Sequence, residues 1–421
     1  MNPNGITEYF TEVETKRKYK GYLLRVAQAI TILILGSMCK LENVKQIHHW
    51  AASDKVSEFL KERFAIERIP CYYWLLRLLQ LVKSESLNEF FTKWVETMLP
   101  EGMRVKVTSE IGTENKVESQ RGDEPIVFTL DGKTVRSTER LESFEDPLHI
   151  VSAHLAELGL TFAQKAVDDK SNEIPAVQAL LEELEIKGCL IVADALNCQK
   201  ATAKIVVEKG ADYLLPVKGN QRRLHNDIVN YVHNEENADN MQSAQTEEKN
   251  RGRIERRTAF VSGDITVIRD RTSWANIASF GAICREVQKR KKGSDEWEES
   301  IEWQYYISSQ ALTAQELLRY ARMEWSVESM HWLLDVHFKE DFCRVADKNG
   351  QKNLNILRKA ALNLVKSYQI ESAPKRPLSR IMFDCLLNPE HLLEIIPSTA
   401  SLKWHSNDAL PAFRSTPSRE C

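Results

Sequence analysis

The sequence of 421 residues lacks the features that mark membrane-spanning, secreted and zinc-binding proteins. Its longest apolar run, residues 27–38, has about 12 residues, fewer than the roughly 20 that a membrane-spanning helix requires. The eight cysteines form no Cys-x-x-Cys pair and are too sparse for a disulfide scaffold. Polar and acidic residues follow Met1, where a secretory signal peptide has a basic and then an apolar stretch. We therefore expect a cytoplasmic protein.

Glycine and proline are scarce, at 16 and 13 residues, and 43% of the residues are hydrophobic. This composition excludes collagen-like, low-complexity and wholly disordered chains. A basic excess is absent as well, because 57 Lys and Arg against 60 Asp and Glu give a net charge of −3. Any binding of nucleic acid must therefore come from local basic patches. The length predicts two or three domains.

Helical periodicity dominates the start of the chain. Apolar residues recur at helical spacing from Glu12 to about Pro100, which predicts an all-helical N-terminal region over residues 1–100. Residues 101–124 are polar and aperiodic, as expected for a linker. At the other end, residues 371–421 are weakly helical and then aperiodic, so we expect a partly disordered extension there.

The region between these ends, residues 125–370, alternates short apolar runs with helical patterns. Strands are expected at 126–130, 190–193 and within 211–221. The first strand is expected to end in a turn at Asp131-Gly132, and a helical stretch is expected around 149–157. Strands that alternate with helices predict an α/β fold with parallel strand pairs.

A different pattern interrupts this region. Short alternating stretches between about 255 and 310 indicate an antiparallel, β-rich insertion, which we bound at about 222–311. Residues 312–338 then return to helical spacing, as one long or broken helix.

Two of the expected strands end in an aspartate, Asp131 and Asp194. If the strands are neighbours, both carboxylates lie at the carboxyl edge of one sheet, where open α/β sheets build their sites. Paired carboxylates repel unless a cation lies between them, and hard oxygen ligands favour Mg²⁺ or Mn²⁺. The alternative is that each aspartate is a turn former or a helix cap.

Glu328 is the candidate for a third acid. It shares one helix face with His331, Trp332 and Asp335, which follow at helical spacing. A carboxylate on this largely apolar helix needs a metal or an arginine such as Arg322 as its partner. From the residues alone, a metal triad and a simple salt bridge both stay open.

Seven motifs, in order along the chain, resemble those of bacterial insertion-sequence transposases of the DDE class, in the ISAs-type group that includes the H-repeat-associated proteins. They are LDGKTVR (130–136), QKAVDDKSNEIPA (164–176), IVADALNCQ (191–199), ADYLLPVKGNQ (211–221), RGRIERR (251–257), EWSVESMHWLLDVHFKEDFCR (324–344) and NLNILRKAALNL (353–364). The helical segment ERIPCYYWLLRLL (67–79) is similar to the associated domain that precedes the catalytic one in this group.

This resemblance implies an RNase H-like catalytic core with a β-rich insertion before its last catalytic helix, preceded by the all-helical N-terminal domain. It implies that Asp131, Asp194 and Glu328 are the catalytic acids and hold two Mg²⁺ (or Mn²⁺) ions. The implied reaction is cleavage of DNA at the ends of an insertion sequence, followed by strand transfer into target DNA. Both steps are in-line displacements at phosphorus, which need chiefly positioning and charge neutralisation.

The wider group carries a Tyr, an Arg and a Lys at fixed offsets from the third acid, where this sequence has Ala321, Glu324 and Asp335. Other basic residues must then hold the DNA strand. The residues expected to bind DNA are Lys218, Arg251, Arg253, Arg256, Arg322 and Lys339. The basic run at 289–292 fits either a phosphate contact or a solvated hairpin tip.

The resemblance implies double-stranded DNA as the partner, namely terminal inverted repeats and target DNA. It also implies a homodimer or larger assembly in the nucleoid-associated cytoplasm of a bacterium. Two alternatives remain at this point: a structure-selective nuclease on the same fold, which cuts without joining, and a catalytically inactive DNA-binding relative.

Overall fold

The computed structural model describes residues 5–16, 22–99, 124–136, 148–167, 173–250, 252–290 and 297–396. The chain forms two compact units. Unit 1 comprises residues 1–122, 132–176 and 327–421, and unit 2 comprises residues 123–131 and 177–326. The expected linker, except for Glu124, lies outside the described residues, and so does the expected extension from residue 397 onward.

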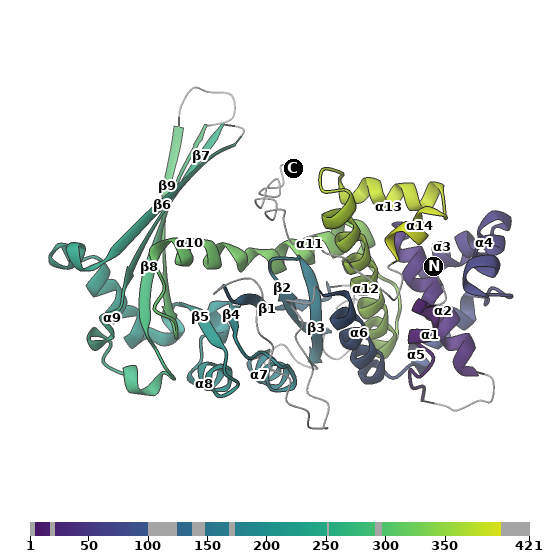
Figure 1. The fold of residues 1–421 in the computed structure, drawn as a ribbon, viewed down its shortest axis with the longest axis horizontal. Coiled ribbons are helices and arrows are strands. Elements are labelled where there is room, and N and C mark those ends of the chain that lie inside the picture. Colours follow the sequence, from purple (N-terminus) through teal and green to yellow (C-terminus); the bar gives the residue numbers. More distant parts are fainter. Residues whose placement is uncertain are drawn as a thin grey trace. The chain divides into compact units, whose positions relative to one another are not determined.

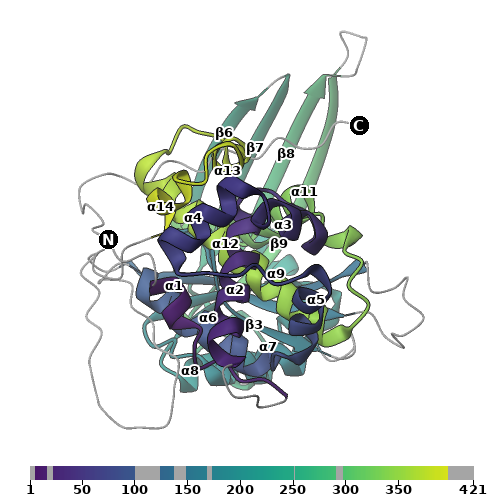
Figure 2. The same cartoon turned by 90° about the vertical axis from the view of Figure 1, so that its right-hand side faces the viewer.

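Unit 1 is mainly helical. Its described helices before residue 100 are α1 (Gly5–Tyr9), α2 (Tyr22–Met38), α3 (Val44–Ala51), α4 (Asp54–Phe64), α5 (Tyr72–Leu81) and α6 (Ser84–Met98). Those at the other end of the chain are α12 (Lys348–Ser372), α13 (Leu378–Leu387) and α14 (His391–Ile395). Helix α12 packs against α2, α5 and α6, all of which lie close to it in Figure 2. Nearly all of residues 26–39 are buried, because a helix that is apolar all round belongs in a core.

Unit 1 also contains two antiparallel strands, β2 (His149–Leu155) and β3 (Leu160–Val167). The helical stretch expected at 149–157 is therefore wrong. Every residue of β2 is buried, so its sequence lacks the alternation of polar and apolar residues that identifies a half-exposed strand. The β-branched residues Ile150 and Val151 favour the extended backbone that β2 adopts.

Strand β1 (Ile126–Thr134) contributes to both units, because the boundary falls between Asp131 and Gly132. The turn expected at Asp131-Gly132 is wrong, since the strand continues to Thr134. A Cβ atom on residue 132 would lie 2.4 Å from His149 Nε2 and 2.5 Å from Glu173 Oε2. Gly132 thus serves close packing against a strand, and it is not part of a hairpin turn.

Unit 2 contains the parallel strands. From β1, the order of hydrogen-bonded neighbours is β4 (Cys189–Ala193), β5 (Asp212–Val217), β9 (Trp297–Ser308), β8 (Ser279–Arg290), β7 (Arg253–Ser262) and β6 (Gln242–Asn250). Strands β1, β4 and β5 are parallel, as the alternation of strands and helices predicts. Helix α7 (Glu173–Glu183) leads into β4, and α8 (Lys200–Glu208) connects β4 to β5 (Figure 1).

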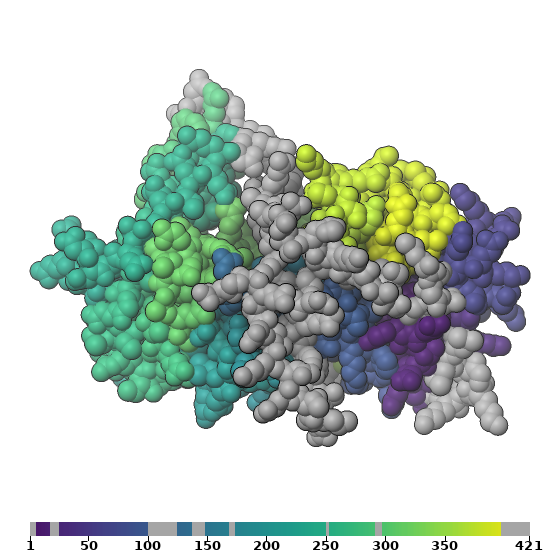
Figure 3. Space-filling view, viewed as in Figure 1, coloured from purple at the N-terminus to yellow at the C-terminus, as the bar shows by residue number. Residues whose placement is uncertain are grey.

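Strands β6 to β9 are antiparallel, and helix α9 (Arg222–Val232) precedes them. Their far ends project from the rest of unit 2 (Figures 1 and 3). The antiparallel strands begin at Gln242, earlier than the expected 255. The sequence pattern did not predict β6, because this edge strand is polar and largely exposed and so has no alternation of polar and apolar residues.

Helix α10 (Ala314–Met323) packs on β6 and β7, and Thr313 with Glu316 forms a capping box at its start. A Cβ atom on Gly281 would lie 2.5 Å from the carbonyl oxygen of Phe260 and 2.8 Å from Leu317 Cδ2, so this glycine permits the close contact of helix and sheet. The helical segment expected at 312–338 is broken at Glu324, after which α11 (Trp325–Phe338) begins. Within the described residues, no helix is both long and apolar enough to cross a lipid bilayer.

Candidate active site

Asp131 and Asp194 lie at matching positions of two paired strands in unit 2. Strands β1 and β4 are parallel, and the last pair in their register is Leu130 with Ala193. Each aspartate directly follows its member of that pair, and each side chain is partly exposed. Because paired strands run about 5 Å apart, the two carboxylates emerge as neighbours at one edge of the sheet. This juxtaposition agrees with the sequence-based expectation.

Asp194 also caps a short helix, as the alternative interpretation of this residue predicts. Its Oδ1 accepts hydrogen bonds from the backbone nitrogen of Asn197 (3.1 Å) and from Asn197 Nδ2 (2.8 Å), at the start of η4 (Ala195–Asn197). Burial raises the pKa of the nearby Cys198 thiol to about 12, and the charge of Asp194 adds to that rise. Each carboxylate oxygen can accept more than one bond, so a capping role does not exclude ion binding.

The loop that follows β5 fastens the loop that carries Asp194. Asn220 Nδ2 donates to the carbonyl oxygen of Ala195 (2.7 Å), and Gln221 Nε2 donates to that of Cys198 (2.9 Å). In the sequence, Asn220 and Gln221 belong to the motif at 211–221, but the sequence alone predicted no role for them. Lys218, expected to bind DNA, begins this loop with an exposed side chain. It follows the third parallel strand and so emerges at the same edge of unit 2 as the two aspartates.

Glu328 lies in the first turn of α11, and its side chain is exposed. It belongs to unit 1, whereas Asp131 and Asp194 belong to unit 2. Within the described residues, no group of three or more His, Cys, Asp or Glu side chains is arranged to hold a metal ion. The convergence of the three acids therefore stays a prediction. Their oxygen donors suit Mg²⁺ or Mn²⁺ and would suit zinc poorly.

Lys133, in the motif that also contains Asp131, anchors the end of β1 within unit 1. Its Nζ donates to Asp335 Oδ1 (2.6 Å) on α11 and to Glu340 Oε2 (2.9 Å) in η9 (Glu340–Phe342). Burial opposes the charge of Lys133, but Glu340 and Asp335 raise its pKa overall. Burial likewise opposes ionisation of Glu340, yet Lys133, Arg358 and Lys359 lower the pKa of Glu340 to about 2. Sequence reasoning gave Lys133 no role, because its partners lie more than 200 residues away.

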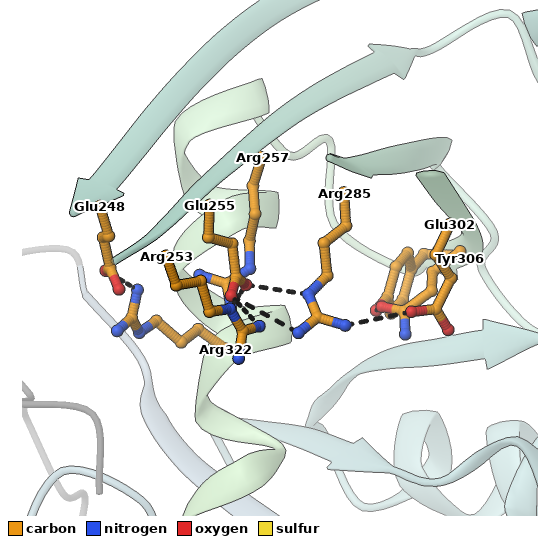
Figure 4. Close-up of polar contacts among 9 residues, drawn as sticks. Glu248, Arg253, Glu255, Arg257, Arg285, Glu302, Tyr306 and Arg322 are labelled. Carbon is orange, nitrogen blue, oxygen red and sulfur yellow. Dashed lines mark hydrogen bonds and ion pairs between the residues drawn. The ribbon is translucent and has the colours of Figure 1, made fainter. Parts of the chain in front are cut away.

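Several arginines of unit 2 surround one buried carboxylate, Glu255 on β7 (Figure 4). Arg253 and Arg257 form ion pairs with it, and Arg285 Nε donates to its Oε1 at 2.9 Å. Burial opposes ionisation of Glu255, but hydrogen bonding from Arg285 and the charges around it lower its pKa overall. We call Glu255, Arg253, Arg257 and Arg285 the Glu255 cluster.

The other residues expected to bind DNA have diverse surroundings. Arg322 forms an ion pair with Glu248 (Figure 4), and Arg256 lies 3.1 Å from Glu247 and 3.6 Å from Glu286. Lys339, in unit 1, has a left-handed backbone between α11 and η9. Arg251 lies outside the described residues. The carboxylates of Glu247, Glu248 and Glu286 offset part of the positive charge of Arg256 and Arg322. The sequence alone did not reveal this.

Comparisons with known proteins agree with these features. Residues 122–364 match the family described as transposase DDE domain, and residues 7–95 match the DDE_Tnp_1-associated family. The chain is 33% identical to the putative transposase YncI of Escherichia coli O157:H7, over 67% of this chain and 71% of that protein. It is 30% identical to the H repeat-associated putative transposase YhhI of Escherichia coli K12, over 76% of this chain and 79% of that protein.

Among solved structures, the chain resembles a piggyBac transposase synaptic complex with hairpin DNA. The TM-score is 0.42 at 11% identity, covering 96% of this chain and 83% of that one, and a likeness this low bears on neither fold nor function. The family matches cover most of the chain, and the DDE match includes Asp131, Asp194 and Glu328. The chain therefore belongs to the DDE transposases, in the H-repeat-associated group.

Proposed function

We propose that this chain cleaves DNA at the ends of an insertion sequence and joins the freed ends to target DNA, with Asp131, Asp194 and Glu328 as the catalytic acids. DDE transposases act on DNA and in general use divalent metal ions. The observation that carries the assignment is the placement of Asp131 and Asp194 at matching ends of the β1–β4 pairing. Two carboxylates at one sheet edge form the beginning of a cation site.

The inclusion of Glu328 is supported by the motif EWSVESMHWLLDVHFKEDFCR (324–344), which resembles that of the family, and by the family match over residues 122–364, which contains it.

The three carboxylates would hold two Mg²⁺ or Mn²⁺ ions, which when bound activate the attacking oxygen and stabilise the leaving oxygen at phosphorus. The protein's own part is positional. The η4 cap and the amides of Asn220 and Gln221 hold the Asp194 loop, and the register of β1 with β4 sets the spacing of the two aspartates. In cleavage, water attacks a phosphodiester, whose P–O3′ bond breaks to leave a 5′-phosphate and a free 3′-hydroxyl. In joining, that hydroxyl attacks a phosphodiester of the target, whose P–O3′ bond breaks and releases a target 3′-hydroxyl.

The strand order also supports an RNase H-like core. The parallel strands β1, β4 and β5 and the antiparallel pair β2 and β3 follow the order β3-β2-β1-β4-β5, and the antiparallel strands β6 to β8 enter between β5 and the last helices. We further propose double-stranded DNA, as terminal repeats and target, and a dimer or larger assembly that acts in the bacterial nucleoid. Lys218, Arg251, Arg253, Arg256, Arg322 and Lys339 are the proposed phosphate contacts.

A reconstituted reaction tests this function. The purified chain is incubated with labelled DNA that carries the sequences flanking its gene, a supercoiled target plasmid and Mg²⁺. We expect cleaved ends and joined products, and we expect Asp131→Asn and Asp194→Asn to lower both by on the order of 1,000-fold. Cleavage without joined products would favour a nuclease, and metal-independent binding without cleavage would favour an inactive relative.

Asp264→Asn is the matched control for Asp194→Asn. Asp264 lies in the same unit and also caps a three-residue 3₁₀ helix, η7 (Ile265–Val267), by accepting a bond from Thr266 N. Asparagine keeps an oxygen that can cap, so any effect of changing a capping aspartate to its amide should appear in both variants, whereas loss of a metal ligand should affect only Asp194→Asn. Equal losses in the two variants would contradict the catalytic role of Asp194.

A further inference from the structure

Three exposed cations lie within six positions after β5 in unit 2: Lys218, Arg222 and Arg223. Their side chains form no ion pair or hydrogen bond with any residue that the structure describes. Many other arginines of this unit are paired. Those that form an ion pair with a carboxylate are Arg253, Arg256, Arg257, Arg269, Arg285, Arg319 and Arg322. The cations after β5 therefore keep a charge that no carboxylate of the described chain offsets.

The loop that carries these cations is bonded to the loop of Asp194. Asn220 Nδ2 donates to the carbonyl oxygen of Ala195, the residue after Asp194, at 2.7 Å. Gln221, which directly precedes Arg222, donates to the carbonyl oxygen of Cys198 at 2.9 Å. All of these residues belong to unit 2. Since β4 and β5 are parallel, both loops emerge at the same edge of the sheet.

The charges at this edge favour a phosphate strand as its ligand. The carboxylates of Asp131 and Asp194 emerge here and would repel the phosphates of DNA. Three nearby positive charges offset that repulsion and attract a polyanion. Each guanidinium group can also bind one phosphate through two parallel N–H···O bonds. Arg222 and Arg223 thus supply the type of contact that holds a DNA backbone beside Asp194.

We propose that Arg222 and Arg223, together with Lys218, bind the phosphates that flank the bond to be cut in the DNA strand. This inference rests on the proposed function and deepens it, because it assigns the residues that hold the strand at the edge of Asp131 and Asp194. The two arginines contribute affinity and position without reading the DNA sequence, since phosphates are the same at every base pair.

The first measurement is the salt dependence of DNA binding. Arg222→Gln and Arg223→Gln are made singly and together in the full chain, and their affinity for the labelled end DNA is followed by fluorescence anisotropy without divalent ions. We expect each change to weaken binding about threefold and the pair to weaken it about tenfold. The slope of affinity against salt concentration should become shallower by about one phosphate contact for each charge removed.

The second measurement locates the contacted phosphates. Phosphates of the end DNA are replaced one at a time by neutral methylphosphonate, and the cleaved bond is mapped with the wild-type chain and Mg²⁺. At a contacted position, the replacement should weaken binding by the wild type but should weaken binding by the double variant no further, because the partners of that phosphate are already absent. These positions should flank the cleaved bond.

Lys187→Gln is the matched control. Lys187 is also exposed in unit 2 and forms no ion pair with a described residue, but it precedes β4 and so lies at the opposite edge of the parallel strands. Its loss should change neither the affinity nor the salt slope. Unfolding temperatures verify that all variants fold.

The outcomes separate this inference from the function on which it rests. The inference is overturned if the double variant binds like the wild type, loses no more affinity than Lys187→Gln, or stays sensitive to every methylphosphonate that flanks the cleaved bond. If the wild type binds end DNA but does not cleave it, the proposed function fails. The salt slopes still test the phosphate contacts in that case, since they need no metal ion.

Discussion

Two buried glutamates of this chain have opposite surroundings. In unit 1, Glu340 and Asp335 share one lysine, Lys133, whereas in unit 2 the carboxylate of Glu255 is shared by three arginines. The first group carries one negative charge in excess, and the Glu255 cluster carries two positive charges in excess. The Glu340 side chain is 1% exposed, while the arginines of the Glu255 cluster are 18% to 33% exposed.

The difference indicates that ion pairs around a buried glutamate serve two purposes in this chain. Around Glu340, the carboxylate and Lys133 are enclosed while Asp335 is partly exposed, and the ion pairs hold a strand and a helix in place. Around Glu255, the carboxylate keeps arginines extended side by side on a sheet, and their surplus charge remains partly open to solvent. A partly exposed row of arginines suits phosphate, because the guanidinium group binds oxyanions in a fixed geometry. The unit 1 group thus fixes geometry, and the Glu255 cluster is suited to holding a ligand.

The largest expected effect comes from removing the central carboxylate of each group. Glu340→Gln leaves Lys133 buried with a weaker partner and should lower the free energy of unfolding by about 3–5 kcal/mol. Glu255→Gln should lower it by about 1–2 kcal/mol, because water reaches the arginines left behind. Urea unfolding measures both, and Glu302→Gln, an exposed partner of Arg285, is the control. Equal losses in the two variants would remove the distinction between the groups.

Acid should act on Glu340 with a defined sign. The pKa of Glu340 is about 2 in the folded chain against an ordinary value of 4.5, so the unfolded chain takes up the proton first. The stability that Glu340 contributes is therefore complete above about pH 4.5 and is lost as the pH falls toward 2. Urea midpoints of wild type and Glu340→Gln, measured at steps through this range, should converge. Parallel curves would show that Glu340 is not ionised at low pH in the folded chain.

The smallest expected effect concerns DNA. Arg253→Gln removes one charge of the Glu255 cluster and should weaken binding of end DNA a few-fold, with a salt dependence shallower by about one phosphate contact. Its unfolding free energy should change little, because two arginines still pair with Glu255. Fluorescence anisotropy at several salt concentrations measures the slope. Lys204→Gln, which removes an exposed helix charge paired with Glu208, should leave the slope unchanged if the cluster binds DNA specifically.

Local patterns sufficed for part of the fold. The apolar runs before Asp131 and Asp194 identified β1 and β4, because short buried runs between helical patterns carry a local signal. Strand β2 was missed because both of its faces are buried. The Asp131-Gly132 pair was misjudged because its local chemistry is that of a turn, whereas the requirement for glycine comes from His149 and Glu173.

The sequence predicted less of the candidate site. The neighbouring positions of Asp131 and Asp194 were predicted. The contacts of Lys133 were not, since its partners Asp335 and Glu340 are 202 and 207 residues away and sequence periodicity gives no information over such a separation. Arg256 and Arg322 were visible as basic residues, yet the glutamates that pair with them lie on other strands, β6 and β8. The positions of charged residues can be identified from the sequence, but which of these charges are neutralised by a partner depends on tertiary contacts.

The edge strand β6 has a consequence for the chain at high concentration. Its nine residues, QSAQTEEKN, offer an unpaired backbone edge of the kind that recruits other chains into amyloid-like stacks. The same residues are short of apolar side chains, and Glu247, Glu248 and Lys249 place like charges opposite each other in any in-register stack. This strand should therefore resist aggregation, so a hydrophobic replacement such as Glu247→Val is a change to avoid when the protein is overproduced.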